Sequence, residues 1–276
     1  IYAAESREDA PVIDPHSVEK LIDDNVVFII GINYFGYSVD WDKIPKSGRY
    51  KIIEDAAGSF GARFKGKPSG SNAELSIMSF HTSKAAAAGG EGGCILTRDG
   101  DIMNTAKAVG KNGHIKGYYY AEMPGMNMLM SDVAACFLSD TIGHFSEMSD
   151  KRRDIIKSVD DILQSAGIKV AKFNHDSDDR TQNYQTYAML MDGDRDLAVE
   201  LMRMGGFEVR PCWPFLITEQ PATQGAVTKT DGSLKHARYF ANHIINIPIN
   251  PACVEGQLDR LEKALPLILN ACKQRS

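Results

Sequence analysis

The chain has few cysteines, and no two of them stand close together. Its 276 residues include five, scattered at positions 94, 136, 212, 253 and 272, with no C-x-x-C pair. A disulfide-stabilised scaffold or a cysteine-rich metal site needs a denser and more regular set. His236 and His243 lie seven residues apart, too far for a helical metal pair. We therefore expect reduced thiols, no metal site and a cytoplasmic protein.

Long apolar runs and an excess of positive charge are also missing. The longest apolar run, residues 26–32, is far shorter than the roughly 20 residues of a membrane helix. The opening IYAAESREDA has neither the basic region nor the apolar stretch of a signal peptide. Lys and Arg number 31 against 36 Asp and Glu, a net charge of -5, which favours neither nucleic acid nor an anionic membrane as a partner.

The pattern that is present predicts an α/β fold. Short runs rich in β-branched residues predict strands at 25–32, 49–57, 75–81 and 94–100, the last with a turn at Asp99-Gly100. Residues 26–32 of the first run are all apolar, which predicts a parallel strand buried on both faces. Asp14 and Pro15 predict the start of a short helix.

The second half has a different pattern, which predicts a second domain. Helical spacing covers residues 130–166, with Gly167 as a cap, and then come a strand at 184–191, a helix at 194–206, an extended segment at 208–215 and a closing helix at 257–273. We place a large α/β domain at residues 1–150 and a smaller α+β domain at 151–276.

Three residue types that suit one cofactor follow predicted strands. Asp55 ends the second strand, and Ser79 and Lys84 stand at and after the end of the third. Ligands of open α/β sheets gather at the carboxyl ends of the strands. Pyridoxal 5'-phosphate (PLP) needs an amine for its aldehyde, a carboxylate for its ring nitrogen and hydroxyl donors for its phosphate. Lys84, Asp55 and Ser79 are our candidates for these roles.

Four segments together resemble the DegT/DnrJ/EryC1/StrS family of PLP-dependent sugar aminotransferases, which have fold type I. They are GINYFGY (31–37), IIEDAAGSFGARFKGKPSGS (52–71), MSFHTSKAAAAGGEGGCILT (78–97) and GMNMLMSDVAAC (125–136). The resemblance runs from about residue 10 to the end. It implies a large domain with a mostly parallel central sheet and a small C-terminal α+β domain.

The resemblance also implies roles for individual residues. Lys84 would form the Schiff base and move the proton during transfer, while Asp55 would pair with the ring nitrogen and Ser79 with the phosphate. Ala57, in the same motif as Asp55, would line the cofactor site. Asn127 would reach the phosphate of the neighbouring subunit's cofactor, so the active unit would be a homodimer. His81, Tyr184 and Arg210 are candidate substrate contacts, each of which could instead be structural.

The chain departs from the family pattern at three places. Gly58 stands where the family has Gln or His near the ring oxygen of the cofactor, and Leu129 stands where it has Arg. The opening residues supply neither the family's Ser-Gly-Thr phosphate turn nor its ring-stacking aromatic residue. We therefore expect that the N-terminal part of the family's large domain lies outside this sequence.

The function that the resemblance implies is transfer of an amino group. The donor would be an amino acid, L-glutamate by resemblance, and the acceptor a keto sugar, nucleotide-linked by resemblance. Two other functions stay open. One is a PLP-dependent sugar dehydratase, although such relatives have His in place of the lysine. The other is a non-catalytic relative that binds a ligand or a regulatory partner.

Overall fold

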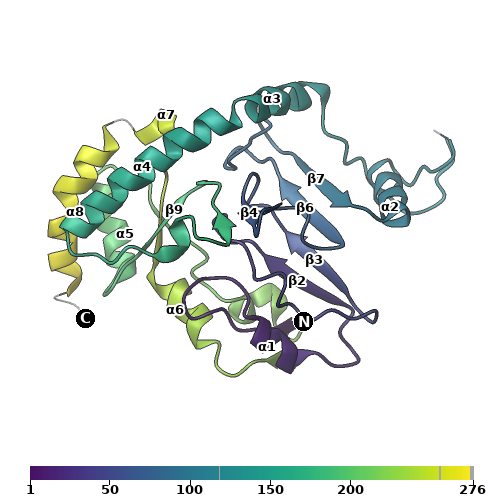
Figure 1. Ribbon diagram of the computed structural model, residues 1–276, viewed down its shortest axis with the longest axis horizontal. Helices are drawn as coiled ribbons and strands as arrows, with labels where there is room; N and C mark the ends of the chain where they lie inside the picture. The colour runs from purple at the N-terminus through teal and green to yellow at the C-terminus, as the bar shows by residue number, and fades with distance from the viewer. Residues whose placement is uncertain (118, 255, 274–276) are drawn as a thin grey trace.

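The computed structural model describes residues 1–117, 119–254 and 256–273, and a four-stranded sheet organises its first half. The strands β2 (Phe28–Ile32), β3 (Lys51–Asp55), β6 (Leu75–Ser79) and β7 (Gly93–Thr97) lie in the order β2-β3-β6-β7. β2, β3 and β6 are parallel, and β7 returns antiparallel to β6. This confirms the four predicted strands and the mostly parallel sheet (Figure 1).

Further helices and short strands accompany this sheet. The helices up to residue 165 are α1 (Pro15–Leu21), α2 (Gly100–Gly110), α3 (Asp132–Gly143) and α4 (Phe145–Ser165). The short strands are β1 (Tyr2–Ala3), paired with β11 (Lys229–Thr230), and β4 (Arg63–Phe64), which lies between β5 (Lys67–Pro68) and β8 (Arg180–Thr181). The predicted N-cap of α1 is confirmed, because the carboxylate of Asp14 accepts a hydrogen bond from the amide of His16 at 3.0 Å.

The second half has its own antiparallel sheet, as the predicted α+β pattern requires. Its strands are β9 (Tyr187–Leu190), β10 (Arg210–Pro211) and β12 (Ile244–Ile247), in the order β10-β12-β9. Its helices are α5 (Arg195–Met204), α6 (Lys235–His243), α7 (Pro251–Val254) and α8 (Gln257–Lys273), and three 3-10 turns lie at Lys172–Asn174, Ile217–Glu219 and Pro221–Thr223.

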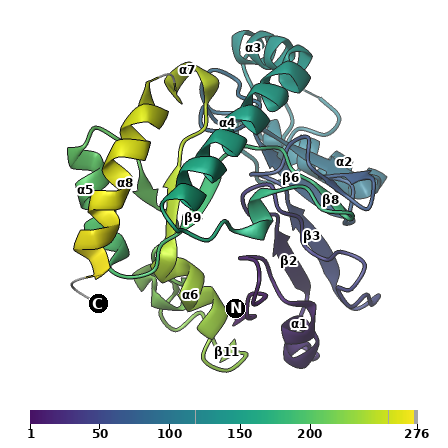
Figure 2. The same cartoon turned by 60° about the vertical axis from the view of Figure 1, so that its left-hand side comes forward.

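The helices α4, α5 and α8 lie together, away from α2 and β7 (Figures 1 and 2). Their apolar faces and β9 enclose a core that includes Leu163, Tyr187, Met202 and Leu265. The predicted cap at the end of α4 is confirmed, because Gly167 has a φ of +77°, in the region that favours glycine. α4 runs through residue 150 as one helix, and the domain boundary near that position stays a prediction.

The prediction that the first strand is buried on both faces is wrong. Within β2, Ile29 is 7 % exposed, whereas Phe28 and Ile30 are 57 % and 55 % exposed. β2 is an edge strand of the sheet, and only the face that carries Ile29 packs on a core, which includes Val39 and Trp41.

The turn predicted at Asp99-Gly100 is also wrong, because these residues begin α2. The carboxylate of Asp99 accepts hydrogen bonds from the amides of Asp101 and Ile102 at 2.9 and 3.1 Å. An Asp-Gly pair suits a tight turn and a helix N-cap alike, and here the cap forms.

Candidate functional site

The carboxyl ends of the parallel strands bring two of the predicted residues onto one edge of the sheet. Ile32 of β2 pairs with Asp55 of β3, and Asp55 pairs with Ile77 of β6. Ser79 ends β6 two residues beyond Ile77, on the same face of the pleat. These strand ends point toward the middle of the molecule, where the C-terminal half begins (Figure 1). Asp55 and Ser79 therefore lie on adjacent strands, as the motifs predict.

Asp55 is followed by a tight turn that contains Ala57. The carboxylate of Asp55 accepts a hydrogen bond from the amide of Ala57 at 2.9 Å, and the amide of Ala56 donates to the carbonyl of Ile77 at 2.9 Å. Both Asp55 and Ala57 are half-buried. The turn holds the carboxylate at the strand end in a fixed orientation.

A buried carboxylate on the other face of β3 supports this turn, and the sequence analysis did not single it out. Glu54 is 0 % exposed and accepts hydrogen bonds from Asn33, Ser69, Asn72 and Ser76 at 2.8–3.2 Å. These donors come from the segments after β2, before β6 and within β6. Glu54 thus connects the strand ends around Asp55 on the face of the sheet opposite to the Asp55 side chain.

Lys84 lies in the loop that joins β6 to β7. The amide of Phe80 donates to the carbonyl of Gly92 at 2.8 Å, and the amide of Ala88 donates to the carbonyl of Phe80 at 2.8 Å, which closes the loop. Within it, the amide of Lys84 donates to the carbonyl of His81 at 2.9 Å. These hydrogen bonds fix the backbone that carries the Lys84 amine. The Lys84 residue itself is half-buried.

The side chain of His81 contacts the same loop. Its Nδ1 lies 2.8 Å from the hydroxyl of Ser83 and its Nε2 lies 3.7 Å from the carboxylate of Glu91. The hydroxyl of Ser79 accepts a hydrogen bond from the amide of His81 at 3.3 Å. These contacts order the Lys84 loop, and a substrate contact for His81 stays a prediction.

Residues of the C-terminal half meet the Lys84 loop from the other side. The thiol of Cys212 lies 4.0 Å from the hydroxyl of Tyr34 and 3.9 Å from the amide nitrogen of Asn246. Burial raises the pKa of the Cys212 thiol, and the nearby positive charge of Lys84 acts in the opposite direction. Burial likewise raises the pKa of the Tyr34 hydroxyl. Both groups are therefore neutral near pH 7.

Two amides that precede β9 also reach this region. The side-chain nitrogen of Asn183 donates to the carbonyl of Gly58 at 2.9 Å, and that of Gln185 donates to the carbonyl of Ser83 at 3.4 Å. They tie the Asp55 turn and the Lys84 loop to the same short segment. No local pattern predicts Gln185 or Cys212, because Ser83 lies 102 residues from Gln185 along the chain and Tyr34 lies 178 residues from Cys212.

The remaining predicted site residues lie elsewhere. Asn127 is exposed and forms a bridge with Lys111, just after α2. Tyr184 is buried, and its hydroxyl accepts a hydrogen bond from Arg153 at 3.2 Å. Arg210 is exposed and begins β10 beside Asn246. The structure brings none of these three into a hydrogen bond with Asp55, Ser79 or Lys84 within the described residues, and their roles stay predictions.

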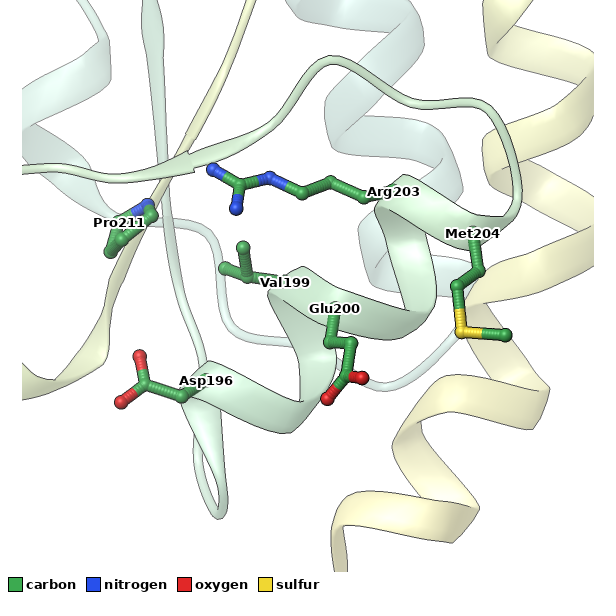
Figure 3. A pocket seen from close by; sticks show the side chains of 6 residues that line it. All are labelled: Asp196, Val199, Glu200, Arg203, Met204 and Pro211. Carbon is green, nitrogen blue, oxygen red and sulfur yellow. The ribbon is translucent and has the colours of Figure 1, made fainter.

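Two surface cavities lie outside this cluster. One, of about 460 Å³, lies between α5 and β10 and is lined by Asp196, Val199, Glu200, Arg203, Met204 and Pro211 (Figure 3). The other, of about 530 Å³, is lined by charged residues that include Arg7 and Asp40. Neither contains Asp55, Ser79 or Lys84. Across residues 1–117, 119–254 and 256–273, no helix is long and apolar enough to cross a membrane, and no three or more His, Cys, Asp or Glu side chains form a group that could hold a metal ion.

An α/β fold with a lysine loop and an acid on the neighbouring strand is typical of a fold type I enzyme. The model of the DegT/DnrJ/EryC1/StrS aminotransferase family matches residues 3–265, and the chain belongs to this family. The resemblance noted from the four sequence segments is thereby confirmed.

Named relatives are similar to the chain over most of its length. It is 26 % identical over 242 residues to the UDP-2-acetamido-2-deoxy-3-oxo-D-glucuronate aminotransferase of Pseudomonas aeruginosa, covering 87 % of this chain and 65 % of that protein. It is 24 % identical over 264 residues to the dTDP-3-amino-3,4,6-trideoxy-alpha-D-glucose transaminase of Streptomyces venezuelae, covering 95 % and 68 %. The chain thus spans about two thirds of the length of these relatives.

The fold also matches a solved structure. The crystal structure of S. venezuelae DesV in complex with a ketimine intermediate superposes with a TM-score of 0.84 at 24 % identity, covering 96 % of this chain and 71 % of DesV. This confirms the fold predicted from the sequence.

Proposed function

We propose that this protein is a PLP-dependent aminotransferase that moves an amino group from an amino acid to a nucleotide-linked keto sugar. The observation that carries the proposal is the placement of Lys84, in a closed loop at the carboxyl edge of the sheet, next to the strand that ends in Asp55. Membership of the family and the printed activities of the two relatives support the reaction and the class of acceptor.

The residues present fit PLP. The cluster offers an amine, a carboxylate and a hydroxyl from Lys84, Asp55 and Ser79 at the ends of neighbouring strands. The side-chain nitrogen of Gln185 donates to the carbonyl of Ser83, next to Lys84, and its carbonyl oxygen is buried without a hydrogen-bond partner among the described residues. When bound, PLP would supply an electron sink for the carbon that loses or gains the amino group.

Each residue of the cluster would have a separate task. Lys84 would hold the aldehyde carbon through its amine and, when released, would move a proton between neighbouring atoms of the bound reactants. Asp55, held by the amide of Ala57, would keep the ring nitrogen protonated. Ser79 would donate its hydroxyl to the phosphate. Cys212, which burial keeps neutral, would add no negative charge near the Lys84 amine.

The donor, the assembly and the location are part of the same proposal. We take L-glutamate as the donor, which the resemblance supports, and expect ping-pong kinetics because donor and acceptor use one site in turn. Asn127 is exposed and so is free to serve a neighbouring subunit in a homodimer with shared sites. The free thiols of Cys94, Cys136 and Cys212 suit a cytoplasmic enzyme.

The Lys84→Ala variant tests the mechanism. Without the amine the protein should lose the visible absorbance of bound PLP, and transamination should fall by at least about 10³-fold, because both attachment and proton transfer are removed. Borohydride reduction of the PLP-loaded wild type, followed by peptide mapping, should locate the phosphopyridoxyl group on Lys84.

The matched control is Lys107→Ala, which removes an exposed lysine of α2 and should leave absorbance and turnover unchanged. Full turnover by Lys84→Ala would exclude the mechanism. An analysis of the sugar product separates the remaining functions: an aminated sugar supports transfer, a deoxygenated sugar with released ammonia supports dehydration, and a protein that takes up no cofactor supports a non-catalytic relative.

A further inference from the structure

The loop that carries Lys84 has few side chains with which to hold its own backbone. The four residues after the lysine are all alanine, and three of them, Ala85, Ala86 and Ala88, are buried. Because an alanine side chain ends at Cβ, side chains of other elements can approach the backbone of the loop closely. The position of Lys84 therefore depends on groups that lie outside the loop.

Two such groups reach the backbone on either side of Lys84. Nη2 of Arg152, which lies on α4, donates to the carbonyl of Ala85 at 3.2 Å. The side-chain nitrogen of Gln185, which lies just before β9, donates to the carbonyl of Ser83 at 3.4 Å. These carbonyls belong to the residues before and after the lysine, so both contacts restrain its backbone.

A third donor reaches the loop from α3, but another carbonyl competes for it. The hydroxyl of Thr141 lies 3.1 Å from the carbonyl oxygen of Ala87 and 2.9 Å from that of Phe137. One hydroxyl hydrogen serves one acceptor at a time. The hold of Thr141 on the loop is thus weaker than that of Arg152, whose acceptor among the described residues is Ala85 alone.

Arg152 is also the most costly of these donors to bury. It is 8 % exposed, and burial lowers the pKa of its guanidinium, since no carboxylate in the described part of the chain offsets the loss of water. Its Nη1 is buried without a hydrogen-bond partner there. An apolar side chain is often more stable than a charged one at such a position. The contact with Ala85 accounts for a charged donor where packing alone would favour an apolar residue.

The helix that carries Arg152 is anchored independently of the loop. Ile156, Val159 and Leu163 follow Arg152 at helical spacing, and all three belong to the core that α4 shares with α5 and α8. Arg152 continues this buried stripe toward the Lys84 loop. The Ala85 carbonyl is therefore held by a side chain whose own backbone is fixed in a packed core.

We propose that Arg152 is a positioning residue for Lys84, which fixes the lysine loop through the carbonyl of Ala85 and so sets where the lysine amine acts. This inference rests on the proposed function, which makes Lys84 the reacting amine. Arg152 acts through the loop rather than on the reactants. A displacement of about 1 Å caused away from the reacting atoms can lower a rate about 10²-fold.

The first test measures amide hydrogen exchange by mass spectrometry on the cofactor-free full chain. Arg152→Met keeps a long side chain and removes the donor, so peptides that cover residues 80–90 should exchange about tenfold faster. Other peptides should exchange as in the wild type, and the urea midpoint should stay close to that of the wild type, because a buried unpaired charge is also removed. Lys151→Met, the matched control at an exposed position of α4, should change neither.

The second test measures turnover. In Arg152→Met, kcat should fall about 10²-fold while both KM values stay within about threefold, and borohydride should still attach the phosphopyridoxyl group to Lys84. Arg152→Lys should recover kcat to within about fivefold of the wild type, since the structure gives the guanidinium one hydrogen bond, which an ammonium can also donate.

A second variant covers the case in which Arg152→Met does not fold, which circular dichroism shows. Arg152→Gln is polar but too short to span the same distance, so it should give the same faster exchange of residues 80–90 and the same loss of kcat.

Two results would overturn the inference. One is unchanged exchange of residues 80–90 together with full kcat in folded Arg152→Met. The other is a loss of kcat that follows the urea midpoint and that Arg152→Lys does not relieve, which would mean that Arg152 supports only the fold. A wild type that takes up no PLP contradicts the proposed function instead, and hydrogen exchange still tests the contact in that case.

Discussion

At the scale of single residues, the most constrained group next to the site is Glu54. It is fully buried, and its carboxylate is surrounded by hydrogen-bond donors from Asn33, Ser69, Asn72 and Ser76. A carboxylate is the one side chain of this size that accepts from all of them, because both of its oxygens are acceptors. Glu54 and Asp55 are adjacent in the chain, yet their side chains face opposite sides of the sheet. Glu54 is enclosed by hydrogen-bond donors of the fold, whereas Asp55 is proposed to contact the cofactor.

We predict that Glu54→Gln lowers the free energy of unfolding by about 2–3 kcal/mol, since the new NH₂ group would face donors such as the amides of Asn33 and Asn72. Urea unfolding followed by circular dichroism measures this change. Glu74→Gln is the matched control, because Glu74 is half-exposed and pairs only with the exposed Lys51 among basic groups of the described residues. An equal effect in both variants would contradict the role given to Glu54.

The residues of the candidate site that follow strands can be predicted from the sequence, whereas those that tertiary packing brings to it cannot. Asp55, Ser79 and Lys84 follow strands, and the geometry of parallel strands brings their ends together whatever the rest of the chain does. Gln185 contacts the Lys84 loop and Cys212 contacts Tyr34 through tertiary packing, and no local pattern encodes either contact. Glu54 precedes Asp55 in the same strand and its side chain points to the opposite face. The sequence does not show which donors surround Glu54, and only the structure does.

At the scale of elements, the strand β2 shows how one apolar run divides between two environments. Ile29 is buried against the core that includes Trp41, and its neighbour Ile30 is more than half exposed. Periodicity cannot separate the two, because every position of the run is apolar. Which positions of β2 are buried depends on the segments that cover each face of the sheet, and these segments are distant in the chain.

We predict that Ile29→Ala lowers the free energy of unfolding by about 2–4 kcal/mol, since it leaves a cavity in a packed core. Ile30→Ala, the matched variant one position along, should cost less than about 1 kcal/mol, because that side chain is largely in solvent. Urea unfolding of both variants gives the two values. A cost for Ile30→Ala as large as that for Ile29→Ala would show that the face with Phe28 and Ile30 is covered in solution.

At the scale of the whole molecule, one buried carboxylate joins segments that are far apart in the chain. Asp40 is 4 % exposed and forms ion pairs with Arg7, Lys43 and Arg180. The guanidinium of Arg180 also lies 4.5 Å from the centre of the Tyr37 ring. These contacts hold the N-terminal segment and the strand β8 against the loop after β2, and so they connect both halves of the sequence.

The charge state of Asp40 makes this connection depend on pH. Burial alone would raise the pKa of Asp40, but the positive charges of Arg180 and Arg7 outweigh it and lower the pKa below its usual value. The folded state therefore binds its proton less tightly than the unfolded state does. The stabilisation is complete above the unfolded pKa of about 4 and is lost as the pH falls through the lower pKa of the folded state.

We predict that Asp40→Asn lowers the free energy of unfolding by about 3 kcal/mol at pH 7, because it leaves Arg180 buried without its carboxylate. The difference in the free energy of unfolding between the variant and the wild type should stay constant down to about pH 5. It should narrow below pH 4, where Asp40 of the wild type itself becomes protonated. Urea unfolding at pH 7, 5, 4 and 3.5 measures it. Asp42→Asn is the control, since the pair of Asp42 with Lys65 is largely exposed and its loss should change little at any pH. If the difference in the free energy of unfolding kept its full size at pH 3.5, the shape of the Asp40 side chain rather than its charge would account for the stabilisation.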